Sequence, residues 1–269
     1  MVKKLYKHEM FYYIRSLLPV YFILLGVAVL GRFVEFFETD TTAYSILRGT
    51  SIFVLVVAVL VTLVLSFVFV IVRFYKNMFS GEGYLTLTLP VTPTNHLLVK
   101  MISAVIVNVA SVIVSLLAIC LFMAGDNLNK AAMKIVDVIE DLAKGLEGQL
   151  PFYILETTLI LLISLVSSIL LFYMCISLGQ LFCKNRILAA VGVYFGLYVF
   201  NQIFGTILSV VLTIFADTWL VNLFTNLFER DYLTTIHMIF GVGIVWSILV
   251  ALVYFLISKF VLTKKLNLE

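Results

Sequence analysis

Histidine and cysteine are the residue types that most often ligate metals or act as nucleophiles, and in this chain they are scattered. His8, His96 and His237 lie far apart, and the three cysteines show no metal-ligand spacing. The cysteines lie in or beside apolar runs, where a thiol packs as a small apolar side chain. We therefore expect no metal centre, and we expect His96 to be an interface histidine.

The motifs of nucleotide-dependent and hydrolytic enzymes do not occur in the sequence. None of the 14 glycines is followed by lysine, which excludes a G-x-x-x-x-G-K-[ST] phosphate loop. Neither H-E-x-x-H nor G-x-S-x-G is found. We expect no catalytic residue, no bound cofactor and no nucleic-acid partner, so any ATP would have to be used by another protein.

Uncharged polar residues interrupt some of the apolar runs, where such groups usually face another helix or a cavity. Asn108 is expected to mediate helix packing. Asn201 and Gln202 are candidates for a cavity or dimer contact. Gly192 and Gly196 are four residues apart on the same predicted helix, a spacing that lets two helices approach closely.

The apolar composition determines which elements must position these residues. Of the 269 residues, 63% are hydrophobic and 12% are charged, and the mean hydropathy is +1.15. A soluble domain carries roughly 25% charged residues, so too little polar surface is present to cover a water-facing globule. The runs are long and continuous, which predicts an all-α integral membrane protein rather than a β-barrel.

Six stretches are long and apolar enough to cross a bilayer, which needs about 20 residues per helix. They cover residues 19–37, 52–72, 101–125, 156–183, 187–216 and 236–259. The first is the weakest, because Arg32 and Glu35 lie at its outer end, where headgroups can solvate them. No small-residue cleavage site follows residues 19–30, so we expect this stretch to remain as a transmembrane helix.

The distribution of basic residues predicts that both termini lie in the cytoplasm. With that orientation most lysines and arginines are on the inner side, and most acidic residues are on the outer side. An excess of basic residues on the cytoplasmic side is what orients membrane proteins. We expect a multi-pass protein of the bacterial cell membrane.

Three segments are expected to lie outside the spans. Residues 1–18 combine lysines with aromatic residues, which predicts an interfacial helix on the cytoplasmic leaflet. Residues 126–150 carry apolar residues at helical spacing opposite charged ones, which predicts an extracellular amphipathic helix that caps the spans or acts as a gate. Residues 217–235 are too polar to span, and we expect short re-entrant or interfacial helices there.

The longest cytoplasmic connection, residues 73–100, has the most distinctive local sequence. Glycines on both sides of Glu82 break the helix, and residues 85–90 alternate at period two. Thr92 followed by Pro93 predicts the start of the third span. A simple turn needs far fewer residues, so we expect a structured cytoplasmic knob.

The run FYKNMFSGEGYLTLTLPVTPTNHLLVKM, residues 74–101, resembles the loop between the second and third spans of permeases in the ABC type-2 exporter class. It looks most like those of Gram-positive bacteria. The six-span layout, the interfacial N-terminal helix and the extracellular insertion before the last span are similar to that class as well. The helix of residues 126–150 departs from the minimal pattern of the class and leaves the type of substrate open.

The resemblance implies a dimer, of two identical permeases or two paralogues, in a lipid membrane. Each copy would dock a cytoplasmic ATP-binding-cassette ATPase that holds ATP and Mg²⁺, and the cargo would be amphipathic or lipophilic, such as a peptide antibiotic, lipid or drug. The implied docking residues are Tyr75, Lys76, Asn77, Met78, Phe79, Glu82 and Tyr84. Two alternatives stay open: a secondary transporter or channel, and a membrane scaffold without transport activity.

Overall fold

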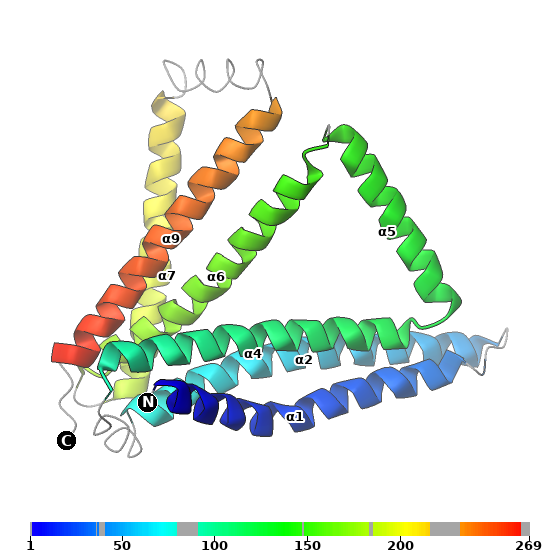
Figure 1. Ribbon diagram of the computed structural model, residues 1–269, viewed down its shortest axis with the longest axis horizontal. Helices are drawn as coiled ribbons and strands as arrows, with labels where there is room; N and C mark the ends of the chain where they lie inside the picture. Colours follow the sequence, from blue (N-terminus) through cyan, green and yellow to red (C-terminus); the bar gives the residue numbers. More distant parts are fainter. Residues whose placement is uncertain are drawn as a thin grey trace. The chain divides into compact units, whose positions relative to one another are not determined.

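The computed structural model describes residues 2–35, 37, 41–79, 91–146, 148–182, 185–215 and 232–264. These residues form seven α-helices and no strand (Figure 1). The helices are α1 (Val2–Glu35), α2 (Thr42–Phe79), α4 (Pro93–Phe122), α5 (Asp126–Gly145), α6 (Leu150–Gly179), α7 (Arg186–Phe215) and α9 (Tyr232–Lys264). All except α5 are long and apolar enough to cross a membrane, which confirms the prediction of an all-helical chain with six candidate spans.

Two of the helices are much longer than the predicted spans. α1 continues through Pro19, so the predicted interfacial helix of residues 1–18 and the first span belong to one helix. α2 contains 38 residues. At about 1.5 Å per residue, a helix of this length is nearly twice as long as the hydrocarbon core is thick, which is about 30 Å. The ends of α2 must therefore extend into the polar regions of the bilayer or beyond.

The loop predicted for residues 73–100 is shorter than expected, because the flanking helices extend into it. Residues 73–79 form the last turns of α2, and residues 93–100 form the first turns of α4. Thr92 has the extended backbone of a residue preceding a helix, with φ −63° and ψ 145°, although its side chain makes no capping hydrogen bond. Pro93 follows at the first helical position, where its missing N–H is no loss, so the predicted start of this helix is confirmed.

The chain divides into two compact units, and the first comprises Met1–Asp141. Within this unit α1, α2 and α4 all pack against one another. Part of their shared apolar core consists of Leu24, Ala28, Leu55, Ala118 and Phe122. Gly31 belongs to the same contact, since a Cβ atom at this position would collide with the ring of Phe122. The close approach of α1 and α4 thus depends on a missing side chain.

The second unit comprises Leu142–Glu269, and in it α6 packs against both α9 and α7. The α6–α7 contact is tight at Gly179, where a Cβ atom would lie 2.7 Å from the backbone nitrogen of Ala190. None of the described side chains of α7 is buried. Such an apolar helix exposes the surface that a membrane-spanning chain presents to lipid or to another protein.

α5 is the amphipathic helix predicted for residues 126–150, and it ends earlier than expected, at Gly145. Glycines in the left-handed region stand on both sides of it, Gly125 with φ 101° and Gly148 with φ 80°. Apolar side chains such as Ile135 and Leu142 are at least half exposed. The extracellular side of this helix stays a prediction. The predicted segment of residues 217–235 lies outside the described residues up to residue 231.

Candidate functional site

A buried group of ionised side chains joins three helices of the first unit; we call Glu9, Arg73 and Lys100 the Glu9 ion cluster. Glu9 lies on α1, Arg73 near the end of α2 and Lys100 in the second turn of α4. Lys100 Nζ donates to Glu9 Oε1 at 2.7 Å, and Arg73 Nε donates to Glu9 Oε2 at 3.3 Å. The residues Glu9, Lys100 and Arg73 are only 1%, 1% and 6% exposed, respectively. Charges shielded from water to this extent interact far more strongly than surface charges.

The surroundings of the cluster compensate its desolvation in part. The guanidinium carbon of Arg73 lies 3.9 Å from the centre of the Tyr12 ring, a cation–π distance. The Glu9 carboxylate uses both oxygens, each facing a cation. Burying an ion pair is costly, but removing one partner afterwards leaves an uncompensated charge and costs about 3–5 kcal/mol. The cluster therefore holds α1, α2 and α4 in one arrangement.

Polar atoms without a hydrogen-bond partner lie on the same segments of α2 and α4. In the described part of the chain, neither ring nitrogen of His96 has a partner, and the same holds for Asn77 Oδ1. His96 is fully buried within the first unit, and its role as an interface histidine stays a prediction. More than 90% of buried polar groups in proteins are hydrogen-bonded, so these segments of α2 and α4 keep unused hydrogen-bonding capacity.

Further polar contacts continue along the same three helices. Ser66 on α2 donates to Asn108 Oδ1 on α4 at 3.2 Å, and Asn108 Nδ2 donates to the carbonyl oxygen of Ala104 at 2.9 Å. The hydroxyls of Tyr21 and Ser111 are 2.7 Å apart, which connects α1 to α4. Asn108 thus connects α4 to α2, in agreement with the predicted role in helix packing.

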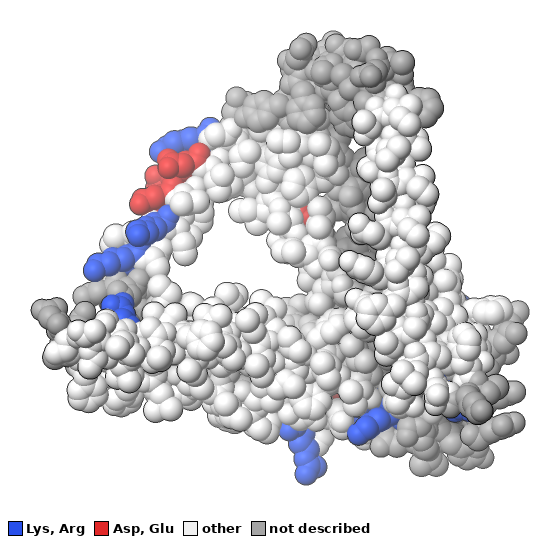
Figure 2. All heavy atoms as spheres, turned by 180° about the vertical axis from the view of Figure 1, so that it is seen from behind, with Lys and Arg blue, Asp and Glu red and all other residues white. Residues whose placement is uncertain are grey.

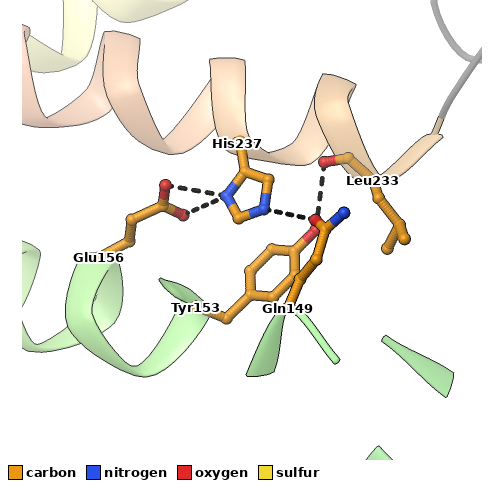
Figure 3. A network of polar contacts seen from close by, with 5 residues as sticks. All are labelled: Gln149, Tyr153, Glu156, Leu233 and His237. Atoms are coloured by element: carbon orange, nitrogen blue, oxygen red, sulfur yellow. Dashed lines mark hydrogen bonds and ion pairs between the residues drawn. The ribbon is translucent and has the colours of Figure 1, made fainter. Parts of the chain in front are cut away.

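A second polar group lies in the other unit, and we call it the His237 network (Figure 3). His237 on α9 is placed between Glu156 on α6 and Gln149, which precedes α6. His237 Nδ1 is 2.8 and 2.9 Å from the two carboxylate oxygens of Glu156, and Nε2 is 2.8 Å from Gln149 Oε1. The Tyr153 ring stacks on the imidazole at 4.2 Å, and its hydroxyl donates to the carbonyl oxygen of Leu233 at 3.1 Å.

The hydrogen-bond pattern at His237 depends on its protonation. With two acceptors, the Glu156 carboxylate and Gln149 Oε1, both ring nitrogens donate, which is the pattern of an imidazolium. If the Gln149 amide is turned over, its nitrogen donates to Nε2 and the neutral imidazole fits. In either case the ring ties α9 to α6 at one end of both helices, and the charge of Glu156 has a hydrogen-bonded partner.

The five described docking candidates all lie in the last turns of α2. The side chains of Asn77, Met78 and Phe79 are buried within the first unit, whereas Lys76 is exposed and Tyr75 is half-buried. Three of them are therefore engaged in packing and are not accessible to a partner in this arrangement. Glu82 and Tyr84 lie outside the described residues.

The predicted cavity or dimer residues all lie on α7 and do not meet another helix of the described chain. Asn201 and Gln202 are exposed. A Cβ atom added at Gly192 or Gly196 would meet nothing within 4 Å. Within the described chain a close helix contact is formed at Gly179, and the dimer contact of Gly192 and Gly196 stays a prediction.

Sequence reasoning missed both polar groups, although each had a signal. Glu9 is an acidic residue among the basic residues of the N-terminal segment, and it shares a helical face with Tyr13 and Leu17, both buried. Glu156 and His237 stand near the ends of apolar runs, where a charged residue without a partner would be costly. These signals mark each residue separately and do not say which partner it finds.

The described residues contain no group of three or more His, Cys, Asp or Glu side chains that could hold a metal ion. No family model matches the chain, and neither a curated protein nor a solved structure matches it significantly.

Proposed function

We propose that this chain is the membrane-spanning permease subunit of an ATP-driven exporter of the ABC type-2 class. It would work as a dimer with a separate cytoplasmic ATPase and move an amphipathic or lipophilic cargo across a bacterial cell membrane. The resemblance of residues 74–101 to that class supports this proposal. The structural observation that carries it is the Glu9 ion cluster.

The cluster lies where movement of a partner ATPase would have to be transmitted to the spans, and a rigid connection is needed there. It connects α1 to α2 just before residues 80–90 and to α4 just after them. A partner that pushes on this connection would act on three spans together, because separating a buried ion pair costs several kcal/mol. The exposed ammonium of Lys76 and the half-exposed ring of Tyr75 offer the partner a contact one turn beyond Arg73.

Copurification and ATPase activity in lipid nanodiscs test the proposal. The chain is co-expressed with a candidate ATP-binding-cassette ATPase from the same genome. The double variant Tyr75→Ala, Lys76→Gln is compared with Lys144→Gln as a matched control far along the sequence. We expect the double variant to lose most of the associated ATPase and the control to keep it. Glu9→Gln should keep the association but lose the stimulation of ATP hydrolysis by the permease. If no ATPase associates with the unaltered chain, the proposal fails.

A secondary transporter is the second candidate, and the same cluster is the observation that favours it. Ionisable groups buried within apolar helices often belong to proton or ion pathways, and Glu9, Arg73 and Lys100 are of this kind. Transport by the purified chain in proteoliposomes, driven by a proton gradient without any ATPase and lost in Glu9→Gln, would favour this function over the first.

A further inference from the structure

A groove at the other end of the first unit combines an apolar wall with basic side chains. It has a volume of about 550 Å³ and lies between α2, α4 and the start of α5. Leu55, Ile119 and Phe122 contribute to the wall. The volume is within the range of about 300–1,000 Å³ that is typical of pockets for small ligands.

All the charged side chains that line this groove are basic. They are Arg48 on α2 and Lys130 and Lys134 on α5. The two lysines are four residues apart and so lie on one face of α5, and both are exposed. Neither forms an ion pair with any residue in the described part of the chain.

The charges of α5 are arranged in separate stretches along the helix. After Asp126 come Lys130 and Lys134, then Asp137, Glu140 and Asp141, and finally Lys144, so basic residues stand on both sides of the acidic stretch (Figure 2). Lys130 and Lys134 line the groove, whereas the acidic stretch lies farther along the helix. The charged side chains that a ligand meets in the groove are therefore cationic.

The groove opens where a lipid would reach it. α2 and α4 are candidate membrane spans, and apolar side chains beside the groove, such as Ile52 and Val56, are about half exposed. The basic residues lie near the ends of these spans, at the depth where headgroups meet a membrane protein. The apolar wall and the basic residues thus follow one another in the same order as the acyl chain and the headgroup of a phospholipid.

We infer that this groove binds an anionic phospholipid, with an acyl chain along the wall and the headgroup phosphate on Lys130, Lys134 and Arg48. A zwitterionic lipid offers the same chain but no net charge, so it binds less tightly. The inference requires neither transport nor an ATPase, and it can fail while the proposed function holds, or hold while that function fails.

Native mass spectrometry of the purified full chain in detergent tests this inference, with phosphatidylglycerol and phosphatidylcholine of identical acyl chains as probes. We expect the unaltered chain to prefer phosphatidylglycerol. The Lys130→Gln, Lys134→Gln double variant should weaken its binding roughly 10- to 30-fold, because each basic residue near a membrane surface contributes about one power of ten or somewhat less. Lys144→Gln, on the same helix but not lining the groove, should leave the affinity unchanged.

A second variant tests the apolar wall independently of charge. Ala131→Trp places a large side chain at the edge of the groove, and we expect it to weaken both lipids while α-helix content stays as in the unaltered chain. Glycerol phosphate without acyl chains should not compete. Equal affinity for the two lipids, or an equal loss in Lys144→Gln, would overturn the inference. So would an acidic amphipathic peptide that binds saturably where phosphatidylglycerol does not.

Discussion

The Glu9 carboxylate lies within hydrogen-bonding distance of two cations on two other helices, at 2.7 and 3.3 Å. Glu9→Gln keeps the shape of the side chain but removes the carboxylate charge that faces Lys100 and Arg73. We expect this substitution to lower the free energy of unfolding by about 3–5 kcal/mol. Thermal unfolding followed by circular dichroism in detergent measures the loss.

Two further variants show whether the loss of stability in Glu9→Gln comes from the ion cluster or from removing any charge on α1. Lys7→Gln removes a charge from the exposed side of the same helix and should cost less than about 1 kcal/mol. Adding Lys100→Met to Glu9→Gln removes one of the two cations that faced the carboxylate and should restore part of the lost stability, so the effects of the two substitutions are not additive. Equal stability of Glu9→Gln and the unaltered chain would contradict the role assigned to the cluster.

His237 connects helices in the second unit as Glu9 does in the first, and its ring contacts three side chains. His237→Phe keeps an aromatic ring against Tyr153 but leaves Glu156 and Gln149 without their shared partner. We expect a loss of about 2 kcal/mol, whereas Glu156→Gln should cost about 1 kcal/mol, because an amide oxygen still accepts a bond from the ring. Tryptophan fluorescence reports this unit, since Trp219 and Trp246 both follow Leu142.

At the scale of whole elements, one missing side chain determines how closely α6 and α7 pack. Gly179→Leu would force its side chain against the backbone of Ala190 and should destabilise the second unit by about 1–3 kcal/mol. Gly192→Leu, on the open face of α7, should leave the unfolding of this unit unchanged. Tryptophan fluorescence during unfolding distinguishes the two. Loss of a dimer by Gly192→Leu, seen in light scattering, would show that α7 meets a second copy.

The helices were predictable from the sequence because hydrophobicity and length are local properties. The start of α4 at Pro93 and the amphipathic α5 were predictable as well, because both follow from residues that are close together in the sequence. Contacts between helices were not predictable, since Glu9 finds Lys100 91 positions away and Glu156 finds His237 81 positions away. Such pairs depend on which faces meet, and many faces of these helices are equally apolar. The burial of Met78 and Phe79 was not predicted, because both residues were expected in the loop of residues 73–100, whereas they belong to the end of α2.

For the whole molecule, the distribution of charge predicts how the chain lies in the membrane. Basic residues dominate the segments around the N-terminus, the end of α2 and the end of α9, whereas α5 carries both signs. The cytoplasmic side attracts basic residues, so α5 and the groove beside it should face outward.

Thiol labelling in intact bacterial cells tests this orientation. In a chain whose three native cysteines are replaced by alanine, a single cysteine is introduced as Lys3→Cys, Lys76→Cys or Lys134→Cys. All three positions are exposed, so each thiol is accessible to the reagent from its own side. We expect a membrane-impermeant maleimide to label position 134 in intact cells and positions 3 and 76 only after permeabilisation. Labelling of position 3 in intact cells would invert the orientation. It would place the Glu9 ion cluster at the outer face, where no cytoplasmic ATPase can act on it.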